Sequence, residues 1–353
     1  MNGDIAMVGF AESPREQPEG TSDVARLIPT ITEALDDIGL DRKDVDFWCS
    51  GSADYLTGAP FAFVGQLEAT GAWPPISESH VEMDGAWALY EAWVRLQHGD
   101  IEVAAVYAAG RPASGAGDMG EVLGVQLDPY YLQPLWPDHV ALAALQAQAW
   151  IDNGGDERGL AEVVAAARLA GAGDPNAVTD GPTDIDELLA APRVAGPLRA
   201  HDCPTFTDGA AVAVLATADR ARRLTEHPVW IRGIDHRIDP HYPTMRDLAS
   251  VSSATAAAQA AGVADAPVEV AELAAGFSHQ VPMLADALEL GPDVDINPSG
   301  GPLVADPMMV TGLVRIGRAA QQITGNGRHR VLAHASSGPA LQQNLVCVME
   351  GGD

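Results

Sequence analysis

Three polar residues in the last third of the chain could carry proton transfer. His279 comes three residues after Gly276 in a predicted turn, Asp306 precedes a proline in a loop, and His334 ends a strand-like run. Imidazole and carboxylate groups are the usual general acids and bases of enzymes, so these three are the candidate catalytic residues. Each also has a structural alternative. His279 could be a satisfied or surface histidine, Asp306 a turn residue bonded to nearby backbone, and His334 a plain strand end.

The three cysteines give no comparable signal. Cys49, Cys203 and Cys347 lie far apart, and their spacing fits neither a zinc cluster nor a disulfide framework. We expect each to be a small buried hydrophobic residue. The sequence therefore predicts no metal site and no bound cofactor.

Composition limits the class of protein. The 353 residues carry a formal net charge of −29, and 47% of them are hydrophobic. Nucleic acids and anionic membranes repel such a chain, because binding to either depends on basic residues that neutralise phosphates. No apolar stretch reaches 18 residues, and the first residues read as a strand rather than an export signal. We expect a globular cytoplasmic protein.

Apolar spacing predicts an α/β protein in which strands alternate with helices. This alternation is typical of βαβ crossovers and of a mostly parallel sheet covered by helices. The predicted strands cover residues 5–10, 45–49, 81–83, 103–109, 210–216, 229–234, 268–273, 330–334 and 345–350. The predicted helices cover residues 23–40, 61–71, 86–95, 138–153, 158–170, 244–261, 281–290 and 311–323.

Loops rich in Pro, Gly and Asp interrupt the alternation between residues 114 and 200. The sequence therefore predicts an N-terminal half over 1–113, an inserted loop domain over 114–200, a return strand of the N-terminal half over 201–226, and a C-terminal half over 227–353. Two βαβ-rich halves around an insertion imply a two-fold pseudo-repeat.

Four motifs along the chain carry a family resemblance. They are VEMDGAWALYEAWVRLQHGDIEVAAVYAAG, VALAALQAQAWIDNGGDERGLAEVVAAARLAGAGDPNAV, HDCPTFTDGAAVAVLA and INPSGG. In this order they resemble the lipid-transfer (sterol-carrier-protein-type) thiolases of the thiolase superfamily over nearly the whole chain. The resemblance implies a thiolase fold: two pseudo-repeated halves in a layered α-β-α-β-α arrangement with an inserted loop domain. The alternative is that these motifs are generic Gly/Pro turns of an unrelated α/β protein.

The family's catalytic residues are replaced. By the resemblance, Gly85 takes the place of the nucleophilic cysteine, and Ala274 and Asp306 take the places of two histidines. A thiolase needs a thiolate, activated at a helix N-terminus, to accept an acyl group from coenzyme A. Glycine cannot supply one, so the chain is not expected to act as a thiolase by itself.

Binding of a coenzyme A thioester as substrate remains open to such a chain. The resemblance implies that acyl-CoA lies between the insertion and two central turns, whose backbone N–H groups face the thioester oxygen. The residues expected to line this substrate site are Gly85, Ala274, Gly300, Gly301, Ser336 and Gly338. The glycines at 300 and 301 could equally be structural, because glycine permits tight turns. N–H donors at this place stabilise a thioester enolate, the leaving group of retro-aldol cleavage.

The resemblance also implies a partner. Relatives without the cysteine include aldolase subunits that cleave steroid side chains, so the expected function is an acyl-CoA-binding subunit of a carbon–carbon cleaving complex acting on 3-hydroxyacyl-CoA. The expected partner is a second thiolase-fold subunit, a small OB-fold/zinc-ribbon protein, or both. Trp87, Tyr90 and Trp93 share one helix face and are expected to fill the space between protomers of a dimer or larger oligomer. A self-contained aldolase and a non-enzymatic acyl-CoA or lipid-binding protein stay open as alternatives.

Overall fold

The computed structural model describes residues 4–58, 60–115 and 118–352. Over these residues, one sheet of ten strands has the order β10-β9-β11-β12-β8-β1-β7-β4-β2-β3. Its strands are β1 Ile5–Glu12, β2 Phe47–Gly51, β3 Glu78–Val81, β4 Val103–Gly110, β7 Gly209–Thr217, β8 Val229–Ile238, β9 Val270–Leu273, β10 Asp295–Ile296, β11 Arg330–Ser337 and β12 Gln343–Glu350. The short strands β5 (Arg193–Ala195) and β6 (Leu198–Arg199) form a separate pair.

The sheet has a two-fold pseudo-repeat. β1 and β8 pair antiparallel at its centre, and the same sequence of directions follows on both sides. From the centre outward, β7 and β4 on one side and β12 and β11 on the other are antiparallel additions. The next two strands on each side are parallel additions. The sheet is therefore mixed rather than mostly parallel, because β7 and β12 run opposite to the strands that helices connect.

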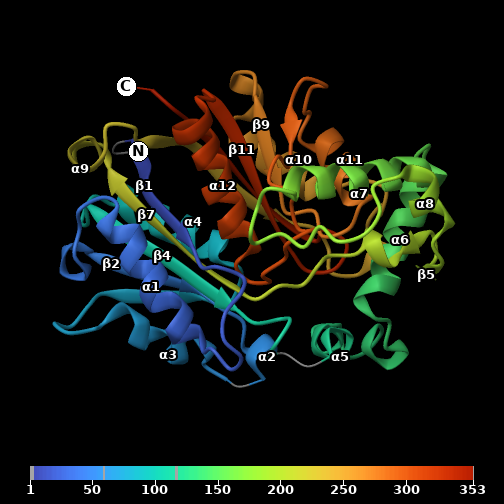
Figure 1. Cartoon of the computed structure of the whole chain (residues 1–353), viewed down its shortest axis with the longest axis horizontal. Coiled ribbons are helices and arrows are strands. Elements are labelled where there is room, and N and C mark those ends of the chain that lie inside the picture. Colours follow the sequence, from blue (N-terminus) through green and yellow to red (C-terminus); the bar gives the residue numbers. More distant parts are fainter. Residues whose placement is uncertain (1–3, 59, 116–117, 353) are drawn as a thin grey trace.

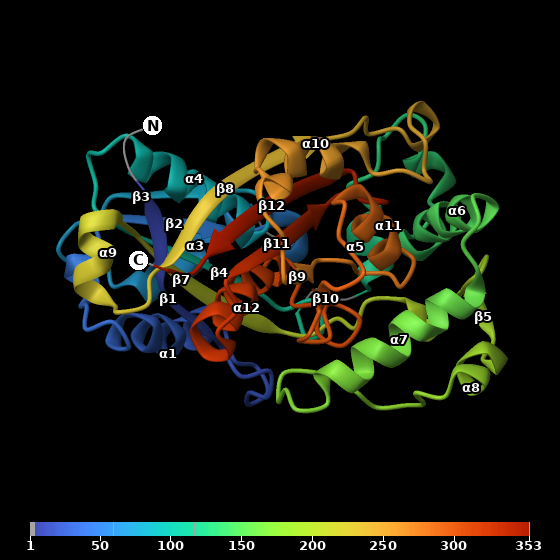
Figure 2. The same cartoon turned by 90° about the horizontal axis from the view of Figure 1, so that it is seen from above.

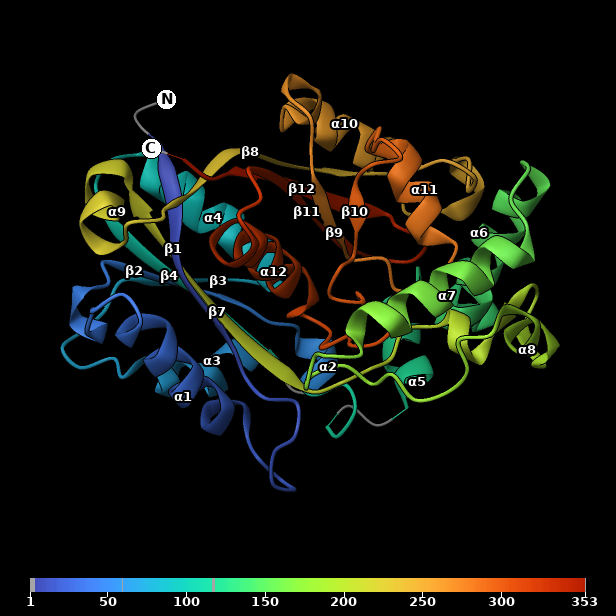
Figure 3. The ribbon, with the colours of Figure 1, turned by 45° about the horizontal axis from the view of Figure 1, so that its top comes forward.

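Helices divide the molecule into layers (Figure 3). α1 (Asp23–Asp36) covers the outer face of the N-terminal strands, and α10 (Ser252–Ala260) with α11 (Gln280–Ala287) covers that of the C-terminal strands. α4 (Gly85–Gln97) and α12 (Thr311–Asn326) lie between the two halves, in the largest apolar cluster. This confirms the expected α-β-α-β-α arrangement.

The remaining helices lie mostly at one end. α5 (Met119–Gly124), α6 (His139–Asp152), α7 (Glu157–Gly171) and α8 (Ile185–Ala190) gather at one end of the molecule in Figures 1 and 2. α2 (Asp54–Thr57), α3 (Ala62–Leu67) and α9 (Ala218–Leu224) belong to the N-terminal half. Within the described residues, no helix is long and apolar enough to cross a membrane.

Two predicted helices are about half as long in the structure as expected. The helix expected over 61–71 is α3 followed by one 3-10 turn, Glu68–Thr70. The helix expected over 244–261 begins at Ser252, where Asp239 accepts the Ser253 N–H at 3.0 Å. Before that point Arg246 donates to the carbonyls of Pro339 and Ala340, which holds the preceding segment in a loop.

The aromatic face of α4 is used inside the chain. Trp87 is 4% exposed, and its ring lies 6.3 Å from that of His236 on β8. The Tyr90 ring lies 4.8 Å from the same histidine, and Trp93 packs against the same apolar cluster. The central position of α4 thus directs Trp87 toward the chain's own core, whereas Tyr90 and Trp93 are half-buried. That this face fills a protomer interface stays a prediction.

Candidate functional site

A cavity of about 400 Å³ lies where the two halves meet the helices of the insertion. Its ionisable and hydroxyl-bearing walls include Tyr55, Glu82, Asp84, His139, Asp306 and Thr311. Its apolar walls include Met83, Leu127, Leu142, Phe206, Phe277 and Met309. A few polar groups among apolar walls are typical of sites for small organic ligands.

Asp84 joins the two central helices at the cavity. It is the N-cap of α4 and accepts the Ala86 N–H at 2.8 Å. It also accepts the N–H groups of Gly312 at 2.9 Å and Leu313 at 3.2 Å, in the first turn of α12. The N-cap residue of α12, Val310, has no capping side chain of its own. One buried carboxylate therefore caps two helices whose N-termini converge.

The contacts at the start of α4 occupy backbone N–H groups that we expected to face the thioester oxygen of the substrate. The Gly85 N–H donates to the Met309 carbonyl at 2.9 Å, and the Ala86 N–H donates to Asp84. The turn at the start of α4 therefore directs these N–H groups at protein oxygens. The expectation that this turn offers them to a thioester oxygen is wrong, because Asp84 and Met309 accept them.

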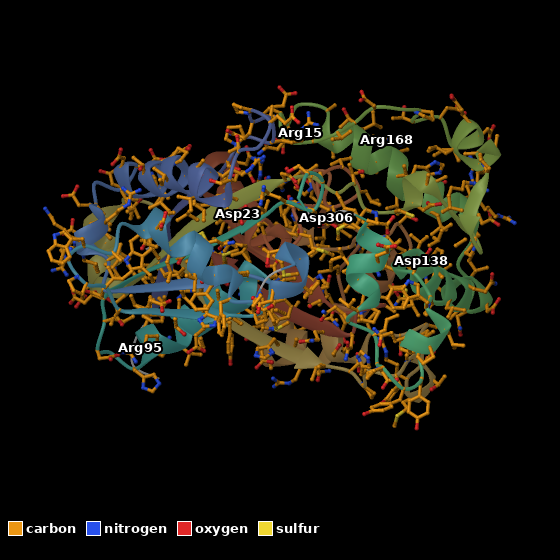
Figure 4. All side chains as sticks on the ribbon, turned by 90° about the horizontal axis from the view of Figure 1, so that it is seen from below. Arg15, Asp23, Arg95, Asp138, Arg168 and Asp306 are labelled. Carbon is orange, nitrogen blue, oxygen red and sulfur yellow. The ribbon has the colours of Figure 1, made fainter. Side chains whose placement is uncertain are left out.

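Asp306 is the buried acid of the cavity. Its backbone is fixed between Thr205 and Thr207, whose carbonyl and N–H it engages at 2.8 and 3.1 Å. Its carboxylate accepts the Thr311 hydroxyl. Burial raises the pKa of Asp306 to about 6, and the neighbouring charge of Asp84 adds to the rise. Figure 4 shows Asp306 in the middle of the molecule, with Asp138 at the start of α6 to one side.

Four of the residues predicted for the site lie in the cavity wall: Ala274, Asp306, Ser336 and Gly338. The Ser336 hydroxyl donates to the Ala274 carbonyl at 2.8 Å, which ties the end of β11 to the end of β9. Gly338 has a φ of +75°, a conformation that glycine adopts without strain. The structure thus brings the ends of these strands together with the loop before α12.

The two predicted histidines lie behind the walls. His279 is fully buried and its Nε2 is 3.1 Å from the Gln146 side chain. His334 is fully buried and its Nε2 is 2.9 Å from Asn344, which in turn donates to Ser253. Burial lowers the pKa of His279 to about 3 and that of His334 to about 4, so both are neutral. Neither lines the cavity.

Three predicted glycines also lie outside the cavity wall. A Cβ at Gly85 would lie 2.9 Å from Ala108 Cβ and 3.0 Å from Leu313 Cβ, so this position faces packed core. A Cβ at Gly300 would lie 2.7 Å from the Ala167 carbonyl oxygen on α7. Gly301, with a φ of +66°, packs against Asn297 of its own turn. These contacts give the three glycines a role in close packing.

Sequence reasoning missed Glu82, Asp84, His139 and Thr311 as cavity residues. Asp84 and Glu82 belong to the motif that drew attention to Gly85, so their side chains could have been considered. His139 follows a Pro-Asp pair at the predicted start of a helix. No local sequence pattern connects the four residues, because they come from distant parts of the chain. Asp84 and its hydrogen-bond donor Gly312 on α12, for example, are 228 positions apart.

No thiol reaches this site. Cys49 and Cys347 are buried in the central apolar cluster, and Cys203 also lies outside the cavity wall. Burial raises the pKa of each of these thiols to about 12, which keeps them protonated. Among the described residues, no group of His, Cys, Asp and Glu side chains could hold a metal ion.

Comparison with known proteins gives related sequences and folds. No protein-family profile matches the sequence. A 17-hydroxy-3-oxo-4-pregnene-20-carboxyl-CoA lyase of Mycobacterium tuberculosis is 27% identical over 260 residues, which cover 69% of this chain and 66% of the lyase. An acetyl-CoA acetyltransferase of Methanothermobacter thermautotrophicus is 26% identical over 179 residues, 44% of this chain and 46% of that enzyme. The chain thus matches less than two thirds of the length of either curated relative.

Solved structures match over almost the full length. An Ltp2-ChsH2(DUF35) aldolase superposes with a TM-score of 0.78 at 20% identity, over 98% of both chains. Human mitochondrial 3-ketoacyl-CoA thiolase in complex with CoA superposes with a TM-score of 0.79 at 13% identity, over 99% of this chain and 98% of that one. The chain has the thiolase fold. The sequence resemblance and the thiolase fold are confirmed, and this thiolase-like protein carries a carboxylate pair where its cavity meets the central helices.

Proposed function

We propose that this thiolase-like protein is a cytoplasmic acyl-CoA-binding subunit of a complex that cleaves carbon–carbon bonds, acting as a retro-aldolase on 3-hydroxyacyl-CoA thioesters with steroid or other lipid side chains. The fold shared with a CoA-bound thiolase supports the binding of a CoA thioester. The sequence relative named as a carboxyl-CoA lyase supports cleavage rather than condensation.

One observation carries the proposal: the buried acid facing the cavity is Asp306, whose pKa is about 6, and no thiol is present there. A carboxylate with this pKa is largely ionised at neutral pH and can accept the proton of a substrate 3-hydroxyl. As the hydroxyl loses its proton, a carbonyl forms at C3 and the C2–C3 bond breaks. Its electron pair passes to the thioester enolate, and C2 then takes up a proton.

The same relatives support the proposal of a partner subunit. The aldolase that superposes on this chain is named as a two-component Ltp2-ChsH2(DUF35) assembly. We propose that this chain likewise works with a second thiolase-fold subunit, a small OB-fold/zinc-ribbon protein, or both, in a dimer or larger oligomer. His279 and His334 are not proposed as bases, because both lie behind the cavity walls.

A second candidate function is a non-catalytic acyl-CoA-binding subunit. The observation that favours it is the use of backbone donors by Asp84 and Met309, which leaves the enolate without the N–H groups of the α4 turn. In that case a partner subunit would carry the chemistry. The two candidates differ in whether Asp306 affects the rate.

The test is co-purification of the tagged chain with the products of neighbouring genes, followed by assay on 3-hydroxyacyl-CoA thioesters. We expect conversion to a shorter acyl-CoA and a ketone or aldehyde in equal amounts. A purified complex that binds no CoA thioester would overturn the proposal. Binding without cleavage, in the presence of every co-purifying chain, would support the non-catalytic subunit instead.

A further inference from the structure

His139 lines the cavity and has no part yet in the proposed reaction. It is the first residue of α6, and the carboxylate of Asp138 caps this helix by accepting the Ala141 N–H at 2.6 Å. Its imidazole lines the cavity, with ring centroids 5.8 Å from Phe206 and 6.3 Å from Phe277. Phe206 also forms a parallel β-bridge with Asp306. Phe206 therefore contacts the His139 ring with its side chain and pairs with Asp306 through its backbone.

The imidazole has no partner for its N–H. Among the described residues no hydrogen bond to either ring nitrogen is found, and Nδ1 is buried as well as unpaired. Burial lowers the pKa of His139, while the carboxylates of Asp138 and Asp118 raise it by less. The ring is therefore neutral at pH 7 and has one N–H to donate. An unpaired buried polar atom at a cavity wall is costly unless a ligand satisfies it.

The proposed reaction needs such a donor. Negative charge develops on the thioester oxygen as the C2–C3 bond breaks, and enzymes stabilise this charge with preorganised hydrogen bonds. At the start of α4 and α12, the N–H groups of Gly85, Ala86, Gly312 and Leu313 donate to Met309 or Asp84. The cavity hydroxyls of Thr311 and Ser336 donate to Asp306 and Ala274, respectively. These groups are engaged within the protein, whereas His139 is not.

We propose that His139 donates a hydrogen bond from its neutral imidazole to the thioester oxygen of the bound acyl-CoA, and so serves as a catalytic residue that stabilises the enolate. The inference rests on the proposed function and deepens it. The imidazole keeps its proton throughout, as an electrophile rather than an acid. Asp306 accepts the hydroxyl proton, so the two residues divide the charge changes at the C3 oxygen and the thioester oxygen.

The test uses infrared spectroscopy of butyryl-CoA labelled with ¹³C at the thioester carbonyl, bound to the chain together with its co-purified partners. Butyryl-CoA has no 3-hydroxyl and cannot be cleaved. We expect the carbonyl stretch to move to lower frequency on binding, and to return toward its free value in His139→Phe. His139→Gln keeps an N–H donor and should keep much of the shift. His98→Phe, at an exposed helix end, is the matched control and should behave like the wild type.

Kinetics provide a second readout. Loss of one oxyanion donor lowers kcat by about 10²–10³-fold, so His139→Phe should show this loss with KM nearly unchanged, and His139→Gln a smaller one. If butyryl-CoA does not bind to the wild type, the proposed function fails and this inference fails with it. If butyryl-CoA binds and the carbonyl frequency is the same in wild type and His139→Phe, the inference is overturned while the proposed function stands.

Discussion

Asp306 is buried and is also the proposed general base. Its side chain lies in the cavity wall, shielded from solvent, beside a second carboxylate, and both features raise its pKa. Such an environment disfavours the ionised form that a general base needs, so a residue serving catalysis here lowers the stability of the fold. This conflict is common at functional sites and gives a measurable consequence.

We predict that Asp306→Asn raises stability at pH 8. The pKa of Asp306 rises from 3.8 in the unfolded chain to about 6 in the fold, so its stabilising contribution is complete below pH 4 and is lost as pH rises through 6. The free energy of unfolding of the variant should exceed that of the wild type by roughly 1–3 kcal/mol at pH 8, and by much less at pH 4. Urea unfolding at both pH values measures this.

Asp180→Asn, at an exposed loop position, is the control and should show no such pH-dependent difference. A variant of Asp306 that is equally destabilised at pH 4 and pH 8 would show that its carboxylate is ionised at little cost.

Sequence reasoning placed some site residues and misplaced others for a physical reason. Ala274, Asp306, Ser336 and Gly338 follow the ends of strands or precede a helix, so the order of motifs is sufficient to bring them together. Residue type gave no such information for His334, because the direction of a strand side chain depends on which face is packed. Its side chain points to Asn344 and Ser253 rather than to the cavity.

At the scale of elements, the convergence of α4 and α12 on Asp84 fixes the layer between the two halves. We predict that Asp84→Ala lowers the free energy of unfolding by about 2–4 kcal/mol, since it leaves three buried backbone N–H groups unpaired at two helix ends. Asp156→Ala removes the cap of a single exposed helix end and should cost about 1 kcal/mol. Equal losses in thermal or urea unfolding would contradict the double cap.

Gly85 provides a second prediction at this scale. A side chain there meets Ala108 and Leu313 at 2.9–3.0 Å, so Gly85→Ala should lower the free energy of unfolding by about 1–3 kcal/mol. Gly65→Ala in α3 meets nothing within 4 Å and should be neutral or stabilising. Gly85→Cys should likewise be destabilised and should not gain thiolase activity. Thiolysis by this variant at rates typical of a thiolase would show that the position faces substrate.

Strands and central helices were predictable because each has a clear apolar period. The breaks within predicted helices were not, because distant contacts cause them. α10 begins where Asp239 accepts backbone and hydroxyl groups of Ser253, and the loop before it is held by Arg246 on the carbonyl of Ala340. The burial of Trp87 was not predictable either, because the sequence does not reveal that α4 lies between the two halves.

At the scale of the whole molecule, the two halves repeat the same pattern of parallel and antiparallel strands, and the cavity between them contains no thiol. We predict that the purified chain shows no thiolysis of a 3-ketoacyl-CoA, because Cys49, Cys203 and Cys347 all lie outside the cavity wall. The release of acyl-CoA is measured in native buffer, before and after alkylation of the three thiols. CoA-dependent thiolysis that survives full alkylation would require a nucleophile other than cysteine.

The alternation of strands and helices was sufficient to predict the pseudo-repeat, whereas the layers were implied by the family resemblance. It was not sufficient to predict the mixed sheet, because strand direction depends on which strands the chain places between the crossover units. β7 and β12 take these positions in the two halves.

The most direct test of the account is the rate of 3-hydroxyacyl-CoA cleavage by the assembled complex carrying Asp306→Asn in this chain. Removal of a general base costs about 10²–10⁴-fold in rate, so we predict a loss of this order while thioester binding, measured by calorimetry, is nearly unchanged. Full cleavage activity in the Asp306→Asn complex would contradict the account and would place the chemistry on the partner subunit.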